Sequence, residues 1–241
     1  MPKSTPEEIR RRFDGDVERF SNLETGQTAT MDAPIALDLI ARAAAAVCPH
    51  AESLLDIGCG AGNYSLKLME TLRLRRVTLV DLSRPMLERA SERIRTAGAV
   101  EITALQTDIR DAEFPGGSFD VAVAAATLHH LRGEEEWSQV FRAIHGWLRP
   151  GGSFWISDLV AHEPAALQEM MWDRYGDYLE ALKGAEYRDQ VFAYIDREDT
   201  PRPLVWQMDR LRQAGFASIE VLHKNTCFAA FGAIQSASRD Y

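Results

Sequence analysis

The sequence predicts an α/β fold: a doubly wound, mostly parallel, seven-stranded sheet between layers of helices, with an antiparallel hairpin at its end. Three observations predict it. Short apolar runs alternate with helical patterns, a glycine-rich loop directly follows the first run, and only two residues separate the last two runs. Strands that alternate with helices are typical of βαβ units, which build parallel sheets.

Five apolar runs are expected to be the buried parallel strands of this sheet. They are Ser53–Ile57, Arg76–Val80, Glu101–Leu105, Phe119–Val123 and Ser153–Ser157. Helical patterns lie between them at Asn63–Leu72, Ser83–Ala97 and Glu134–Leu148. The segment 148–152 carries Pro150 and two glycines, so we expect a turn that ends the last of these helices and leads into the fifth strand.

The chain after residue 203 is expected to complete the sheet. A helical pattern covers Leu204–Ala214, and two strand-like runs follow at Ser218–His223 and Thr226–Ala233. Only Lys224 and Asn225 separate these runs. The sequence therefore predicts an antiparallel hairpin whose turn is formed by these two residues.

Two other segments are expected to be helical attachments to the sheet. A capping box at Thr5–Glu8 predicts a helix that runs through Phe20, and a second helix is expected from Ala33 to Val47. The segment that precedes the last helix is long and aromatic, which is typical of a lid. We expect four parts: an N-terminal helical cap (1–47), a sheet core that carries the ligand site (48–160), a helical insertion that serves as a substrate lid (161–203), and the last helix with the hairpin (204–241).

Composition excludes several classes of function. The chain has 241 residues and a formal net charge of -9, which opposes binding to nucleic acid. No run approaches the roughly 18 apolar residues of a membrane span, and the N-terminal residues lack the apolar core of a secretory signal, so we expect a cytoplasmic protein. Cys48, Cys59 and Cys227 are scattered, which predicts reduced thiols without a disulfide framework or a zinc site.

The glycine-rich loop after the first strand indicates a nucleotide-like ligand. Asp56 ends the strand, Gly58 and Gly60 follow, and a helix begins near Asn63, so backbone N–H groups face the ligand. The dinucleotide fingerprint would place Gly or Ala where Asn63 stands, and the P-loop lysine is missing. The Asp56 carboxylate would repel a pyrophosphate but attracts an ammonium or a sulfonium. We therefore predict S-adenosyl-L-methionine as the cofactor, in contact also with Cys59.

Two further acids follow neighbouring strands. Asp81 lies about twenty residues past the glycine loop, where an acid receives ribose hydroxyls, although an aspartate there can also cap the next helix. Leu82 is expected against one face of the adenine, with Met86 nearby. The third strand is followed by two more predicted adenine contacts, Asp108 to the amino group and Ile109 to the other face of the ring. A turn aspartate is the alternative for Asp108.

Five segments in register resemble class I S-adenosylmethionine-dependent methyltransferases, which have Rossmann-like folds. They are Leu54–Tyr64, Thr78–Leu87, Ala104–Asp111, Phe119–Leu131 and Leu148–Leu159. The resemblance implies that the first motif holds the methionine part of the cofactor, the second acid the ribose and the third the adenine. It also implies a methyl transfer that leaves S-adenosyl-L-homocysteine.

The end of the fourth strand is expected to carry the reaction. Chemistry in doubly wound sheets lies at the carboxyl ends of strands, so His129 and His130 should lie near the methyl donor, where either can assist deprotonation of the acceptor. Ala124 and Thr127 are expected to contact the methionine end through their backbones. Catechol-type methyltransferases carry a metal-binding aspartate after this strand, but here alanines stand there, so we expect no metal.

The acceptor is expected to be a small molecule, because the motifs of DNA, protein-amide and arginine methylases are missing. The predicted acceptor contacts are Phe13, Phe20, Trp172, Tyr175 and Arg188. Arg188 also supports an alternative, since a carboxy-S-adenosylmethionine synthase needs an arginine for the added carboxylate. A catalytically silent cofactor-binding subunit is a further alternative. We expect a monomer or a homodimer.

Overall fold

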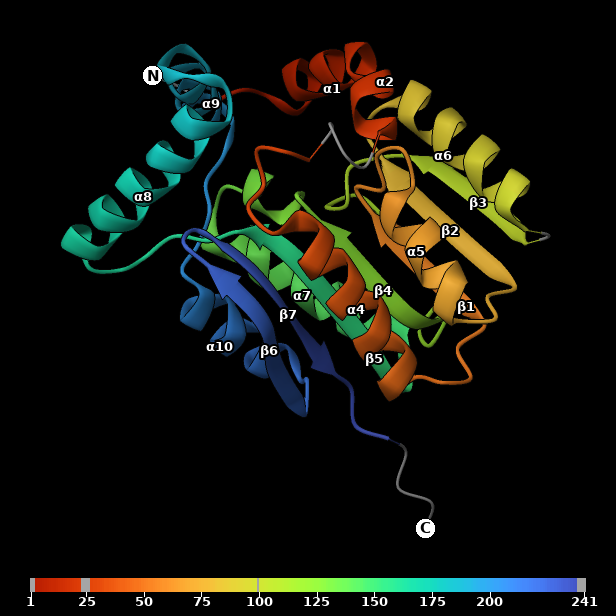
Figure 1. Ribbon diagram of the computed structural model, residues 1–241. Helices are drawn as coiled ribbons and strands as arrows, with labels where there is room; N and C mark the ends of the chain where they lie inside the picture. Colours follow the sequence, from red (N-terminus) through yellow and green to blue (C-terminus); the bar gives the residue numbers. More distant parts are fainter. Residues whose placement is uncertain (1–2, 23–26, 99, 238–241) are drawn as a thin grey trace.

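The structure, a computed structural model, describes residues 3–22, 27–98 and 100–237. At its centre lies a seven-stranded sheet with the order β3-β2-β1-β4-β5-β7-β6 (Figure 1). Strands β1 to β5 pair in parallel, and β7 runs antiparallel to both β5 and β6. The strands are β1 (Ser53–Ile57), β2 (Arg76–Asp81), β3 (Glu101–Gln106), β4 (Phe119–Ala125), β5 (Leu148–Leu159), β6 (Ser218–Asn225) and β7 (Phe228–Ile234). The predicted fold class is confirmed.

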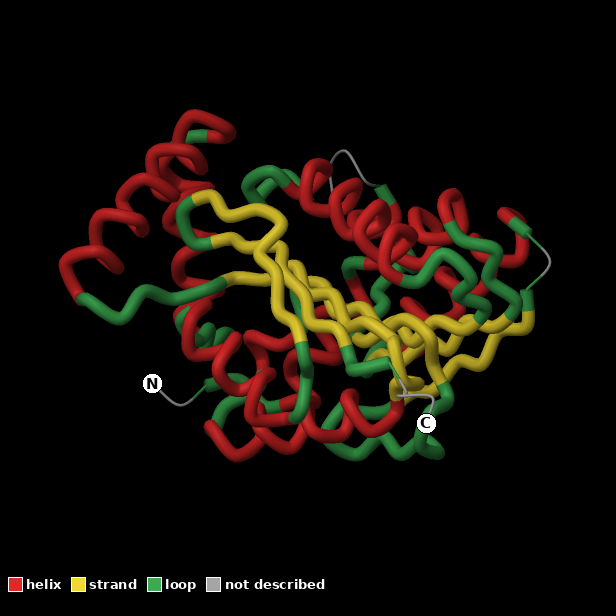
Figure 2. Tube along the Cα trace, turned by 90° about the horizontal axis from the view of Figure 1, so that it is seen from below, coloured by secondary structure: helices red, strands yellow, loops and turns green. Residues whose placement is uncertain are grey.

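Helices cover both faces of the sheet (Figure 2). Successive residues of a strand point to opposite faces, and the neighbours Leu54 and Leu55 accordingly lie in two different apolar clusters, one on each face. The helices are α1 (Pro6–Gly15), α2 (Val17–Ser21), α4 (Ala33–Val47), α5 (Asn63–Thr71), α6 (Arg84–Ala97), α7 (Glu134–Trp147), α8 (Ala165–Lys183), α9 (Ala185–Glu198) and α10 (Leu204–Ala214), with a short 3-10 helix η1 (Leu128–His130).

Two expected elements differ in detail from the structure. The predicted first helix is two helices, because the chain breaks at Asp16, whose backbone leaves the helical region. The predicted turn before the fifth strand belongs to β5 itself, since Leu148 already pairs with Phe119. The capping box is confirmed: the Thr5 side chain accepts from the Glu8 N–H, and the Glu8 carboxylate accepts from the Thr5 N–H.

The hairpin is confirmed, but its turn lies two residues later than expected. Lys224 and Asn225 still pair with β7, and the turn consists of Thr226 and Cys227. Thr226 takes a positive φ of 46°, the conformation that tight hairpin turns require. A shift of the β6 register between Val221 and His223 accompanies the extra length of the strand.

Two helical units lie beyond the carboxyl ends of the central strands (Figure 1). The insertion forms α8 and α9, and a small apolar cluster that includes Tyr175 and Leu179 joins it to the end of β5. Helix α1 is tied to the end of α9, where the Ser4 N–H donates to the Arg197 carbonyl at 3.0 Å. In the described part of the chain, no helix is long and apolar enough to cross a membrane.

Candidate cofactor and acceptor site

A cavity of about 610 Å³ lies between the carboxyl ends of β1, β2, β4 and β5 and the helices α1, α2, α8 and α9. Its floor is formed by the glycine-rich loop and the strand ends. Its walls on the opposite side come from the N-terminal helices and the insertion. The position agrees with the rule that ligands of doubly wound sheets bind outside the carboxyl ends of the strands.

Backbone hydrogen bonds to the second strand hold the glycine-rich loop. The N–H groups of Gly58 and Cys59 donate to the Val80 carbonyl at 2.7 and 3.1 Å. Gly58 has a positive φ of 63°, and a Cβ there would lie 2.1 Å from the Thr127 Oγ1. Over Gly60, by contrast, no atom lies within 4 Å of the Cβ position. The loop is therefore fixed on its strand side and open on its cavity side.

Both strand-end carboxylates line this cavity and are held by backbone donors. Asp56 Oδ2 accepts from the Ser65 hydroxyl at 2.6 Å and the Ser65 N–H at 3.2 Å. Asp81 Oδ2 accepts from the Gly60 N–H, and its Oδ1 accepts from the Ser83 N–H, each at 2.8 Å. Burial raises the pKa of each carboxyl to about 6. Both are ionised at neutral pH and give this end of the cavity a negative charge.

The other predicted cofactor residues divide into two groups. Those that line the cavity are Cys59, Asn63, Leu82, Met86 and Thr127. Asp108, Ile109 and Ala124 are absent from the lining that the described residues form. Arg110 binds both oxygens of Asp108 and, against the effect of burial, holds the pKa of this carboxyl below its usual value. The predicted adenine role of Asp108 and Ile109 stays a prediction.

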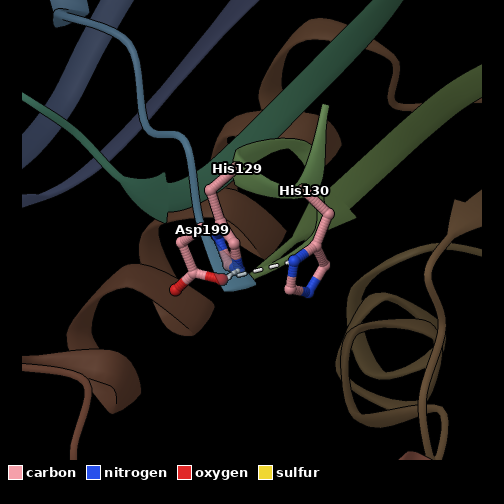
Figure 3. Close-up of side chains that lie close together, drawn as sticks. All are labelled: His129, His130 and Asp199. Carbon is pink, nitrogen blue, oxygen red and sulfur yellow. Dashed lines mark ion pairs between the residues drawn. The ribbon is translucent and has the colours of Figure 1, made fainter. Parts of the chain in front are cut away.

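The lining of the same cavity contains His129, His130 and Asp199, which lie close together (Figure 3). Asp199 Oδ1 lies 3.6 Å from His129 Nε2 and 3.3 Å from His130 Nδ1. The two imidazole rings are 4.3 Å apart between centroids and inclined by 68°. On its other side, His129 Nδ1 pairs with Asp158, which also accepts from the Leu128 N–H at 2.9 Å. Two buried carboxylates thus hold the ring of His129.

The two histidines have different electrostatic environments. Burial opposes a charge on His129, but Asp158 and Asp199 outweigh it and raise its pKa to about 9. Burial and the neighbouring His129 lower the pKa of His130. His130 Nε2 is buried and has no hydrogen-bond partner within the described ranges. At neutral pH, His129 is therefore a fixed cation and His130 a neutral imidazole.

Asp199 and Asp158 were not found by the sequence analysis. Asp158 follows the apolar residues of β5, and its place at a strand end is a signal that could have identified it. Asp199 lies 70 positions after His129 and directly follows α9, and no local pattern connects the two. The connection is tertiary: the Thr200 N–H donates to the His129 carbonyl at 2.7 Å.

The acceptor side of the cavity is rich in aromatic rings. Of the predicted acceptor contacts, Phe13, Phe20 and Tyr175 line the cavity, whereas Trp172 and Arg188 lie outside its lining. Trp172 stacks on Phe192, and Arg188 pairs with two acids of the insertion. Lining residues that were not among the predicted acceptor contacts include Tyr187, Val191, Tyr194, Ile195 and Phe228. Most of them lie on one face of α9, which was only expected to be part of a helical lid.

Comparison with known proteins identifies the sheet core. Residues 54–152 match the family model described as a methyltransferase domain. The 27-O-demethylrifamycin SV methyltransferase of Amycolatopsis mediterranei is 31% identical over 181 residues, which are 70% of this chain and 64% of that protein. A carboxy-S-adenosyl-L-methionine synthase of Vibrio atlanticus is 27% identical over 195 residues, which are 78% of each chain.

A similar fold occurs in the solved structure of Burkholderia thailandensis 1,6-didemethyltoxoflavin-N1-methyltransferase, which contains its substrate and S-adenosylhomocysteine. The TM-score is 0.64 at 19% identity, and the match covers 98% of this chain and 92% of that one. The chain spans between 56% and 64% of the length of the first curated relatives that it matches. Residues 54–152 are therefore similar to methyltransferase domains.

Proposed function

We propose that the protein transfers the methyl group of S-adenosylmethionine to a small molecule, at an atom that carries a proton. One observation carries this proposal. A single cavity joins the glycine-rich loop and its two carboxylates to an aromatic chamber, and a histidine pair lies at the edge of that chamber. This arrangement provides separate places for a cationic nucleoside and for an apolar acceptor.

The residues of the first compartment fit the proposed cofactor. Asp56 and Asp81 supply two negative charges for an ammonium, a sulfonium and ribose hydroxyls, and the open space over Gly60 admits a ligand. Leu82 and Met86 offer an apolar surface beside Asp81 for a flat base. When bound, S-adenosylmethionine supplies a methyl group that is already activated by its sulfonium.

The chain's own residues then have to align the acceptor, exclude water and remove a proton. Phe13, Phe20, Tyr175 and Tyr194 enclose the acceptor's place from α1, α2, α8 and α9. With S-adenosylmethionine bound, the acceptor atom would take up the methyl group while the sulfur keeps the electron pair, and the proton that the acceptor loses would pass to the histidine pair. We propose His130 as the proton acceptor, because its Nε2 is unpaired within the described ranges.

The insertion is proposed to act as the lid of this site. Residues 161–203 contribute one wall of the cavity and, through Asp199, one member of the histidine cluster. The cap of residues 1–47 contributes the facing wall, and Arg12 joins it to Glu198 at the end of α9 at 2.8 Å. We retain the four-part division of the chain on this basis.

A second candidate function is a carboxy-S-adenosyl-L-methionine synthase, which the Vibrio relative favours because the match covers 78% of both chains. Arg188 does not support it, since this side chain pairs with Glu180 and Asp189 outside the cavity lining. Arg12 and Arg19 line the cavity, but Arg12 is occupied by Glu198. The geometry therefore favours methyl transfer.

Two measurements test the proposed function. Mass spectrometry of the ligand released from purified protein should find S-adenosylmethionine or S-adenosylhomocysteine, whereas a ligand heavier by a carboxylate would support the synthase. A panel of phenols, alcohols, amines and thiols with radiolabelled cofactor should then yield a methylated product. Cofactor binding without turnover over the whole panel would support a silent subunit. A lack of cofactor binding in calorimetry would reject the proposal.

A further inference from the structure

We propose that His129, His130 and Asp199 bind one divalent transition-metal ion at the acceptor end of the cavity. Whether the ion binds does not depend on the proposed function. Its use in holding an acceptor rests on that function. Within the described ranges, these three residues are the group whose donor atoms lie close enough for an ion, all within 4.8 Å of one another. The analysis of the sequence predicted no metal, because it found no carboxylate after β4.

The donor set and its spacing suit a transition metal. Zinc binds imidazole nitrogens and carboxylate oxygens at about 2.0–2.2 Å, which places tetrahedral ligand atoms about 3.3–3.6 Å apart. Asp199 Oδ1 lies 3.3 and 3.6 Å from the two ring nitrogens. Two imidazoles and one carboxylate form a set found around zinc and iron(II), whereas magnesium and calcium prefer oxygen ligands. The three donor atoms lie within 4.8 Å of one another, so the two imidazoles would have to approach each other to bind one ion.

The surroundings of His129 are those of a metal ligand. A ligating histidine usually donates its second ring N–H to a carboxylate, which fixes the ring and its tautomer. Here Asp158 occupies Nδ1 and leaves Nε2 toward Asp199. Asp158 is itself fixed by the N–H groups of Leu128 and Leu159, at 2.9 and 2.7 Å. This outer contact is already formed without the ion.

Charge also favours a cation at this point. Asp158 and Asp199 are 3% and 4% exposed, and buried carboxylates need a partner of opposite charge. Nearby cations are directed elsewhere: Arg12 binds Glu198, and Lys3 donates to the Asp199 carbonyl and not to its carboxylate. The imidazoles are the groups that face the two acids. The protonated ring of His129 can balance only one of the two carboxylates, whereas a dication would balance both and leave both imidazoles neutral.

Three protein ligands leave a position open, and the three residues line the cavity. The open position suits an oxygen of the acceptor, such as a hydroxyl or a carboxylate, which the ion would hold beside the methyl donor. The ion would occupy His130 Nδ1, and a neutral imidazole bound in this way carries its proton on Nε2, so it can no longer accept a proton there. A metal-bound cluster and a histidine base are therefore alternative states, which an experiment can separate.

The test uses full-length protein that has been treated with a chelator and desalted. Zinc is added in calorimetry, and cobalt(II) is added as a spectroscopic probe. We expect one equivalent of zinc to bind, with a visible cobalt spectrum and with shifted imidazole resonances of His129 and His130. Asp199→Asn keeps the size of the side chain, and we expect at least a roughly tenfold weaker affinity for zinc. His130→Asn should have a similar effect.

His223→Asn is the matched control. His223 Nε2 also pairs with a carboxylate, that of Asp32 at 2.8 Å, but it lies outside the cavity lining, so this variant should bind zinc like the wild type. The proposal is overturned if wild-type protein binds no zinc, if zinc leaves both imidazole resonances unchanged, or if Asp199→Asn and His130→Asn bind zinc with wild-type affinity. Calorimetry with S-adenosylmethionine on the metal-free protein tests the proposed function separately.

Discussion

The two ends of the cavity are built in different ways. The cofactor end is centred on one loop between a buried strand and a helix, and hydrogen bonds from backbone N–H groups join this loop to the end of β2. The acceptor end joins α1, η1 and the end of α9, which lie far apart along the chain, through side-chain contacts such as Arg12 to Glu198. The difference indicates a rigid cofactor site beside an acceptor site whose shape depends on the packing of helices.

The two ends of the cavity should respond differently to substitution. Changes at the cofactor end should abolish cofactor binding, because the backbone cannot relax around them. Changes at the acceptor end should leave cofactor affinity intact and act on stability or on the acceptor. Substitutions and changes of pH can therefore test this difference between the two ends.

The largest effect is expected from Gly58→Ala. The added methyl would lie 2.1 Å from Thr127 Oγ1, in a residue that already has a φ of 63°. Strain and overpacking together should cost about 4 kcal/mol in cofactor binding or in stability. Calorimetry and thermal unfolding measure the two losses. Gly133→Ala is the control, since no atom lies within 4 Å of its Cβ position and its φ is -92°. Normal cofactor binding by the Gly58 variant would show that the loop is not rigid.

A smaller effect, of another kind, is expected from Arg12→Ala. The Arg12 guanidinium binds the Glu198 carboxylate at 2.8 Å and the Tyr194 hydroxyl at 2.7 Å. Its removal leaves Glu198, which is 3% exposed, without this partner and should destabilise the fold by about 3 kcal/mol. We expect weaker acceptor binding, seen as a higher KM, and an unchanged cofactor affinity. Arg11→Ala should change neither quantity, because Arg11 is a mostly exposed neighbour that pairs only with the surface residue Glu7 in the described part of the chain. A loss of cofactor affinity in the Arg12 variant would mean that the two ends are coupled.

The same contrast explains how much could be predicted from the sequence. The strands and the cofactor loop follow from local patterns, because apolar runs and glycines determine the local backbone. The positions of Asp56 and Asp81 follow from the rule that parallel strands end at one edge. Asp199 could not be predicted, because its place beside His129 depends on how an insertion of two helices folds back. The hairpin turn was misplaced because Lys224 and Asn225 are compatible with both a strand and a turn.

A pH series tests the contribution of the two carboxylates to cofactor affinity. The carboxyls of Asp56 and Asp81 both have a pKa raised to about 6, so they take up protons as the pH falls through that value. Because the protonated forms no longer attract a cation, cofactor affinity should fall by about tenfold per carboxyl at one pH unit below 6. Calorimetry between pH 5 and 8 measures this slope, and Asp81→Asn should remove part of it. A constant affinity over this range would contradict a role for these charges.

The smallest effect is expected from Arg188→Gln, at the outer side of the lid. Arg188 pairs with Glu180 and Asp189, and these surface ion pairs contribute little to stability because water screens them. The side chain lies outside the lining of the cavity, so turnover and cofactor affinity should stay within about twofold of wild type. Kinetics with the identified acceptor and calorimetry with the cofactor check this, with Arg174→Gln on α8 as the comparison. A specific loss of affinity for a carboxylated cofactor in the Arg188 variant alone would restore the synthase, since that loss requires the arginine to reach into the cavity.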